Sequence, residues 1–145
     1  MDASDAELVA EQQVWAATDV TARNQAFNIV NGDSFTWKQL WPVLAVKFGL
    51  QLPLAAHMVD ESLSLVEMMC DKGPVWDEIV RLNFLWPTRM QDLADWLFLD
   101  VILKFPFKIL ASTEKCRDHG FCSTKDTESS LGYWIDKMRD GRLVP

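Results

Sequence analysis

AFNIVNGDSFTWKQLW, residues Ala26–Trp41, predicts a buried strand, a tight turn and the start of a helix. Its first part, Ala26–Val30, carries aromatic and β-branched side chains that favour a strand. Asn31–Asp33 is an Asn-Gly-Asp turn, which depends on the ability of glycine to adopt a positive φ. Thr36 and Gln39 have the spacing of a capping box before an apolar run. A strand that passes directly into a tryptophan-rich helix is therefore expected here.

The rest of the chain predicts helices, each delimited by a capping residue, a glycine or a proline. Ser4 and Glu7 suggest a capping box, and Pro42 should kink the second helix or delay its start. Residues Gln51–Asp60 are expected to be irregular, and Gly141 is expected to cap the last helix. The expected helices are Ser4 to just before Asp19, Thr36–Phe48, near Ser64–Asp71, Pro74 to before Pro87, Thr88–Lys104, Ser112–Asp118 and Thr127–Asp140.

Composition indicates one domain, or a large piece of one. The chain has 145 residues, 49% of them hydrophobic, and a net charge of −7 without a block of like charge. Nucleic acids and anionic membranes favour a basic face, so neither is an expected partner. No apolar run approaches the roughly 20 residues of a membrane span, and the acidic start MDASDAEL does not have the pattern of a signal peptide. Three cysteines suit a reducing compartment, so we expect a cytoplasmic location.

The same strand-to-helix stretch resembles the plant progesterone 5β-reductases and iridoid synthases, which are extended short-chain dehydrogenases/reductases. Other segments match that family in the same order: SDAELVAEQQVWAAT, GPVWDEIVR, WLFLDVIL and YWIDKMRDGRLVP. The resemblance implies an α/β fold, of which residues 1–145 form one mostly helical, C-terminal, substrate-side portion with one or a few short strands. The N-terminal NADP-binding domain of this extended Rossmann-type fold is expected to be absent from the chain.

The resemblance also implies a chemistry. In the family NADPH gives a hydride to the β-carbon of an enone, while a tyrosine and a lysine hydrogen-bond the carbonyl and stabilise the enolate. The glycine-rich loop, the tyrosine and the lysine belong to the N-terminal half of the family. We therefore expect no catalytic and no cofactor-binding residue in this chain, and a substrate-binding portion that is inactive alone.

The best candidate site is one apolar stripe. Phe98, Ile102 and Phe105 fall at i, i+4 and i+7, which by periodicity alone favours plain core packing. The resemblance implies instead that this helix lines the mouth of the substrate pocket, with the Phe98 position facing the enone. Apolar walls suit a lipophilic steroid or terpenoid enone. Residues Lys104–Leu110 depart from the family pattern.

Two further motifs are expected to be structural. Tyr133 and Lys137 have the Y-x-x-x-K spacing of many short-chain dehydrogenases, but no glycine-rich dinucleotide loop precedes them. Cys116, His119 and Cys122 could supply three zinc ligands, whereas a structural zinc site takes four. We expect no metal site. The tryptophans are expected to pack in the core, except Trp86, which lies in a loop.

Two alternatives to a reductase portion remain open. One is a small module that binds an apolar ligand, and the other is an interaction fragment without catalysis. Leu82 and Phe84 depart from the family, whose loop here is typically more polar and contains a glycine, and they form a candidate exposed apolar patch. Self-association through a surface that the missing domain would cover is expected.

Overall fold

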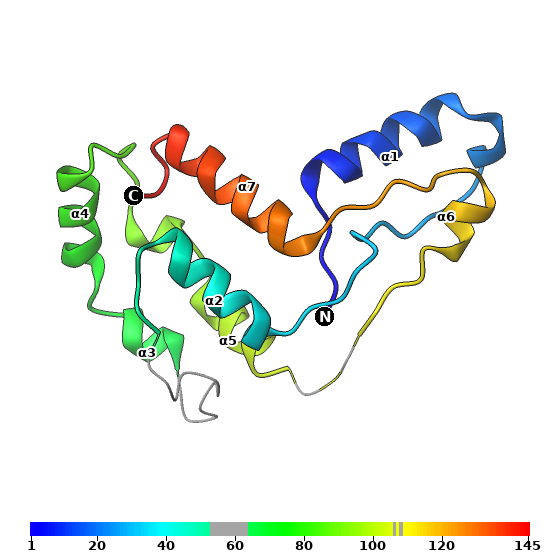
Figure 1. Ribbon diagram of the computed structural model, residues 1–145. Helices are drawn as coiled ribbons and strands as arrows, with labels where there is room; N and C mark the ends of the chain where they lie inside the picture. Colours follow the sequence, from blue (N-terminus) through cyan, green and yellow to red (C-terminus); the bar gives the residue numbers. More distant parts are fainter. Residues whose placement is uncertain (53–63, 106, 108) are drawn as a thin grey trace. The chain divides into compact units, whose positions relative to one another are not determined.

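The computed structural model describes residues 1–52, 64–105, 107 and 109–145, and helices account for all its regular structure there (Figure 1). The chain divides into two compact units. Unit 1 contains Met1–Leu40 and Lys108–Gly132, and unit 2 contains Trp41–Phe107 and Tyr133–Pro145. None of the helices in the described residues is long and apolar enough to cross a membrane. The elements are α1 (Ala6–Thr18), η1 (Val20–Ala22), α2 (Trp37–Lys47), α3 (Leu65–Met69), α4 (Gly73–Leu82), η2 (Met90–Asp92), α5 (Trp96–Leu103), α6 (Glu114–Asp118) and α7 (Thr127–Asp140).

Most of the expected helices are confirmed, with differences at their ends. The predicted helix over Thr88–Lys104 is wrong in its first half, where only the short 3₁₀ turn η2 forms. Asp95 separates η2 from α5, because its backbone is extended and its carboxylate accepts a hydrogen bond from Phe98 N at 2.9 Å. The expected irregular segment Gln51–Asp60 lies outside the described residues, apart from its first two positions.

Two of the predicted caps are corrected. The N-cap of α1 is Asp5, whose carboxylate accepts hydrogen bonds from two backbone N–H groups of the first turn, whereas the Ser4 hydroxyl donates to a distant carbonyl. At the end of α7 the left-handed residue is Arg142, with φ +57°, and not Gly141. The Thr36 capping box is confirmed, since Gln39 Oε1 accepts from Thr36 N at 2.8 Å.

The prediction of a strand at Ala26–Val30 is wrong. No strand occurs in the described residues, and this segment is extended without hydrogen bonds to a neighbouring strand. Side chains satisfy its backbone groups instead. The Asn28 carbonyl accepts hydrogen bonds from Gln12 Nε2 and from the Cys116 thiol, both at 3.1 Å. The carbonyl of its first residue accepts from Lys115 Nζ at 2.9 Å. A strand requires a neighbour that offers a row of N–H and C=O groups, and strand-forming side chains alone do not provide one.

The apolar core of unit 1 lies beneath α1 and α6. Buried Leu8 from α1, Cys116 from α6 and Phe121 form its centre. Trp15 joins this cluster from α1, with its ring centroid 5.0 Å from that of Phe27 and 5.2 Å from that of Phe121. Aromatic pairs at these separations contribute beyond their buried area. Phe27 and Ile29, in the segment expected to be a strand, thus pack against this core cluster.

A buried polar network joins separate parts of unit 1. Asn31 is only 1% exposed, and its Oδ1 accepts from Asp5 N at 2.7 Å while its Nδ2 donates to Thr127 Oγ1 at 3.0 Å. Asp33 accepts from Thr127 N at 2.8 Å, and the Asp5 carboxylate accepts from the Ser130 hydroxyl. The turn between Asn31 and Asp33 therefore ties the start of α1 to the start of α7.

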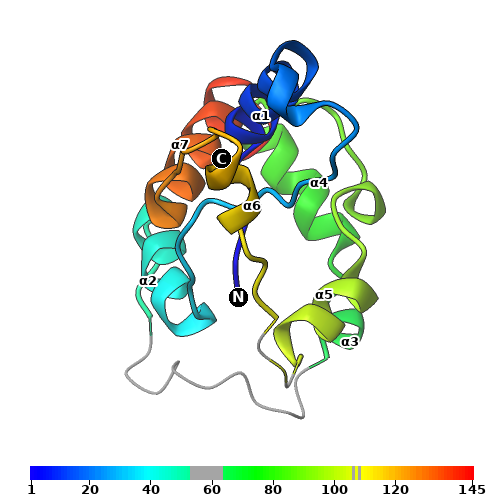
Figure 2. The ribbon, with the colours of Figure 1, turned by 90° about the vertical axis from the view of Figure 1, so that its right-hand side faces the viewer.

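Asp100 and Lys47 connect helices within the described part of unit 2. A buried carboxylate of α5, Asp100, accepts hydrogen bonds from Leu65 N at 2.8 Å and Val66 N at 3.3 Å, and so caps α3. Figure 2 shows α3 and α5 side by side. The end of α2 contacts α7, where Lys47 forms an ion pair with Asp136.

We predict that Asn31→Ala lowers the free energy of unfolding by about 2 kcal/mol, because it leaves buried donors and acceptors without partners. Urea unfolding of the purified chain measures the change. Asn28→Ala is the matched control, since its exposed side-chain amide donates, among the described residues, only to the Ser112 carbonyl, and we expect an effect within about 0.5 kcal/mol. Equal losses in the two variants would contradict the role given to Asn31.

Asp100 predicts a pH dependence of stability. Its backbone hydrogen bond from Leu65 N is the main cause that lowers the pKa of its carboxyl group. Because the folded pKa lies below the unfolded value of about 3.9, ionised Asp100 stabilises the fold at neutral pH. This contribution is lost as the pH falls through the folded pKa. Melting curves between neutral and acidic pH should therefore show a smaller acid-side loss for Asp100→Asn than for the wild type.

Candidate functional site

The predicted stripe lies on α5 and just beyond its end. Phe98 is 60% exposed, Ile102 is half-buried, and Phe105 is 43% exposed. Phe98 and Ile102 are one helical turn apart, whereas Phe105 follows the helix and its N–H donates to the Ile102 carbonyl at 3.4 Å. Phe98 therefore differs from the buried residues of unit 2, since most of its ring is open to solvent. The exposure of these side chains leaves them available to line a binding surface.

Asp100 fixes the helix that carries this stripe. Its carboxylate is buried on the side of α5 that meets α3, while Leu97, Phe98 and Val101 are more than half exposed. An ionised side chain that accepts several backbone hydrogen bonds holds both helix segments in one register. Sequence reasoning missed this residue, although a single acidic side chain within the apolar run WLFLDVIL was the available signal.

A groove of about 590 Å³ lies beside the start of α5 within unit 2. Its walls include the apolar side chains of Val66, Met69, Trp96 and Leu97, and none of the three predicted site residues lines it. Arg89 lies at its edge, where its guanidinium donates two hydrogen bonds to Asp92 at 2.7 and 2.9 Å. These bonds lower the pKa of the Asp92 carboxyl group. The groove can accept a mostly apolar molecule, and its residues come from elements that periodicity could not place together.

The Tyr133 and Lys137 pair lies on α7, with Lys137 Nζ 5.5 Å from the centroid of the Tyr133 ring. This is a cation–π contact between side chains one turn apart. Tyr133 is 41% exposed.

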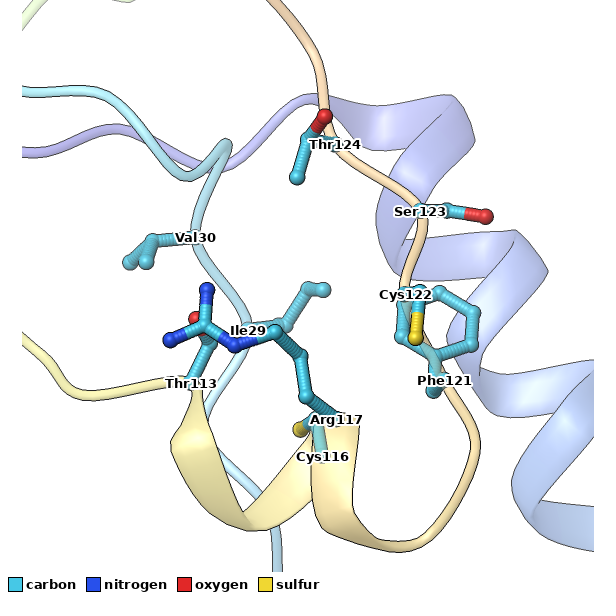
Figure 3. A pocket seen from close by; sticks show the side chains of 9 residues that line it. All are labelled: Ile29, Val30, Thr113, Cys116, Arg117, Phe121, Cys122, Ser123 and Thr124. Atoms are coloured by element: carbon cyan, nitrogen blue, oxygen red, sulfur yellow. The ribbon is translucent and has the colours of Figure 1, made fainter.

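The three possible zinc ligands have other contacts. Cys116 is buried with its thiol on the Asn28 carbonyl, and His119 Nδ1 lies 2.8 Å from the Lys115 carbonyl. Cys122 is exposed, and Figure 3 shows it beside Phe121 at a pocket of about 10 Å³. A volume of this size is at the lower limit for one water molecule. In the part of the chain that the structure describes, no three His, Cys, Asp or Glu side chains are gathered for a metal ion.

Trp86 is exposed as expected, whereas the tryptophans expected to pack in the core are not fully buried. Trp86 is 65% exposed in the loop after α4, whereas the others are half-buried. Trp76 shows how the N–H of a half-buried indole finds a hydrogen-bond partner, because its Nε1 donates to the Thr88 carbonyl at 3.0 Å.

Leu82 and Phe84, which are expected to form an exposed patch, are both exposed, with 58% and 79% of their surfaces accessible to solvent.

Comparison with curated proteins gives matches along the whole chain. (S)-8-oxocitronellyl enol synthase CYC2 from Camptotheca acuminata is 49% identical over 146 aligned residues, which cover 99% of this chain and 36% of the relative. The 3-oxo-Delta(4,5)-steroid 5-beta-reductase of Arabidopsis thaliana is 41% identical over 145 residues, or 100% of this chain and 37% of the relative. (S)-8-oxocitronellyl enol synthase from Catharanthus roseus is 42% identical over 144 residues.

The chain thus spans about a third of the length of the curated relatives that it matches. No protein-family model matches it. The family resemblance found in the sequence is confirmed by identities of 41–49% over the full chain. This chain belongs, as a segment of the family's sequence, to the plant (S)-8-oxocitronellyl enol synthases and steroid 5β-reductases.

Proposed function

We propose that this chain is the C-terminal, substrate-side portion of an NADPH-dependent reductase of enone carbon–carbon double bonds, and that it does not catalyse the reaction alone. The observation that carries the proposal is its relationship, over its whole length, to enol synthases and a steroid 5-beta-reductase of which it covers about a third. The names of these relatives support the proposed substrate class, a lipophilic terpenoid- or steroid-like enone. The N-terminal dinucleotide-binding domain is proposed to lie outside the 145 residues.

The described residues do not fit a nicotinamide dinucleotide. A cradle for a pyrophosphate consists of a strand, a glycine-rich loop and the N-terminus of a helix. No such unit occurs within residues 1–52 and 64–105 or in the described residues that follow, and the six glycines are scattered. No reaction step is therefore assigned to this chain.

Its proposed contribution is an apolar wall for the substrate. Phe98 presents an aromatic ring that is 60% exposed, and Ile102 lies one turn further along the same face of α5. Asp100 holds that helix against α3, so the wall does not depend on a mobile loop. An apolar wall favours a hydrocarbon skeleton and excludes water from the reacting double bond. Phe105 is proposed to extend the wall beyond the helix.

The exposed apolar face of α5 also supports the second candidate function, an interaction fragment or apolar-ligand module without catalysis. Leu97 and Val101, at 66% and 53% exposure, add to the surface around Phe98. A contiguous apolar surface of this kind marks an interface or a binding site, and it also supports self-association of the isolated chain.

All three cysteines are free, which supports the proposed cytoplasmic location.

The first test is a titration of the purified chain with NADPH, followed by cofactor fluorescence. We expect no tight binding, because the pyrophosphate cradle is not among the described residues. A dissociation constant below about 10 μM, which corresponds to roughly −7 kcal/mol, would contradict the proposal that the cofactor site lies in another part of the protein.

The second test places this sequence behind a complete N-terminal half from the family and compares two variants. Phe98→Ala should lower kcat/KM for a bulky enone at least about tenfold and change stability by less than about 1 kcal/mol, because its ring is mostly exposed. Ile135→Ala is the control: Ile135 is 2% exposed, and its truncation should cost about 2–5 kcal/mol. Melting temperature and kcat/KM are measured for both.

The two measurements separate the outcomes. If Phe98→Ala unfolds the chimera while the surviving protein keeps its activity, Phe98 is a core residue and the wall is misplaced. If the unmodified chimera folds but reduces no enone, the assignment to an enone reductase fails.

A further inference from the structure

The two carboxylate oxygens of Asp100 have separate partners on α3. Oδ1 accepts a hydrogen bond from Leu65 N at 2.8 Å. Oδ2 accepts one from Val66 N at 3.3 Å and lies 3.4 Å from the Ser64 hydroxyl oxygen. The side chain is only 8% exposed, so the carboxylate is held between the two helices, which Figure 2 shows side by side. Both oxygens are therefore used as acceptors.

The position of α3 depends on these hydrogen bonds. The helix has five residues, whereas isolated helices shorter than about 12–15 residues are marginal in water. The N–H groups of its first turn have no partners within the helix. The Ser64 hydroxyl accepts from Glu67 N at 3.3 Å, and Asp100 accepts from Leu65 N and Val66 N. Two of the first-turn donors are thus satisfied from α5, which fixes α3 against that helix.

Phe98 lies on the other side of α5. It precedes Asp100 by two positions, which corresponds to about 200° around a helix of 3.6 residues per turn. Its ring is 60% exposed, and Val101 beside it is 53% exposed. Because α5 is one regular helix from Trp96 to Leu103, a rotation that moves Asp100 away from α3 also moves the ring of Phe98.

We propose that Asp100 is a positioning residue for the substrate wall. Its two oxygens set the rotation of α5 against α3, and so the place of the Phe98 ring beside a bulky enone. This inference rests on the proposed function as the substrate-side portion of an enone reductase. It assigns the selectivity of the wall to a side chain that does not touch the substrate.

The substitution Asp100→Asn isolates this role. An amide has nearly the shape of a carboxylate, but only one of its two terminal atoms accepts hydrogen bonds. Its NH₂ group must therefore face the N–H of either Leu65 or Val66, and two donors repel each other. We expect the helix pair to shift although the size of the buried side chain is almost unchanged.

The test uses the chimera that joins this sequence to a complete N-terminal half from the family. The ratio of kcat/KM for a bulky enone to kcat/KM for a small one is measured on the same sample, so it does not depend on the folded fraction. A small enone makes few contacts with the wall. Asp100→Asn should lower this ratio at least about tenfold, since small misplacements of positioning groups are costly. KM should rise more for the bulky enone than for the small one.

A double-mutant cycle shows whether Asp100 acts through Phe98. Residues that act through one interaction give non-additive losses. The double variant Asp100→Asn, Phe98→Ala should therefore lower the ratio no more than about twofold beyond Phe98→Ala alone. Asn31→Ala is the stability control, because it removes buried hydrogen bonds in unit 1 and should leave the ratio unchanged.

Leu65→Pro provides a second route to the same interaction. It removes the N–H that donates to Asp100 at the first residue of α3, where proline is tolerated. It should lower the ratio as Asp100→Asn does, and it replaces that variant in the cycle if Asp100→Asn does not fold.

The outcomes separate this inference from the proposed function. An active chimera whose ratio is unchanged by Asp100→Asn and Leu65→Pro would overturn the positioning role. Additive losses with Phe98→Ala, or an equal fall of the ratio in Asn31→Ala, would do the same. A folded chimera that reduces no enone would overturn the proposed function, and this inference with it.

Discussion

The side chain of Asn31 is the constraint on which unit 1 depends. Its amide oxygen accepts from the backbone at the N-cap of α1, and its amide nitrogen donates to Thr127 at the start of α7. These groups are 26 and 96 residues from Asn31 along the chain. An amide buried to 1% exposure must have partners for its donors and acceptors. Asn31 therefore specifies one arrangement of chain segments, because any other arrangement leaves that amide without its partners.

This constraint explains what the sequence could predict. Local chemistry placed the turn at Asn31–Asp33, the cap at Thr36 and the limits of α7, because each depends on residues within one turn. The prediction from local chemistry was wrong at Ala26–Val30, where the side chains favour a strand but none forms in the described residues. There the carbonyl of Asn28 is satisfied by Gln12 and Cys116, which are 16 and 88 residues away. Strand propensity is a property of the side chains, whereas strand formation also requires a neighbouring segment that pairs with the backbone N–H and C=O groups.

The same distinction applies to the candidate site. Periodicity found that Phe98 and Ile102 share a face of α5, yet by itself it favoured burial, and the structure leaves most of the Phe98 ring exposed. The missing information was Asp100, which turns the opposite side of the helix toward α3 through hydrogen bonds from Leu65 and Val66. An acidic residue in an apolar run is a sequence signal for such a cap, but its partners lie about 35 residues away. The resemblance to the reductase family, and not the pattern, pointed to a ligand-facing role.

Residues at two places in unit 2 are exposed for different physical reasons. On α5 the exposed face is part of a regular helix whose other side is anchored by Asp100, which accepts hydrogen bonds from the start of α3. At Phe84 and Arg142 the backbone itself is strained. Strain at an exposed helix end costs stability. The backbone hydrogen bonds that close these helix ends, from Leu85 N to the Val80 carbonyl and from Leu143 N to the Met138 carbonyl, offset part of that cost.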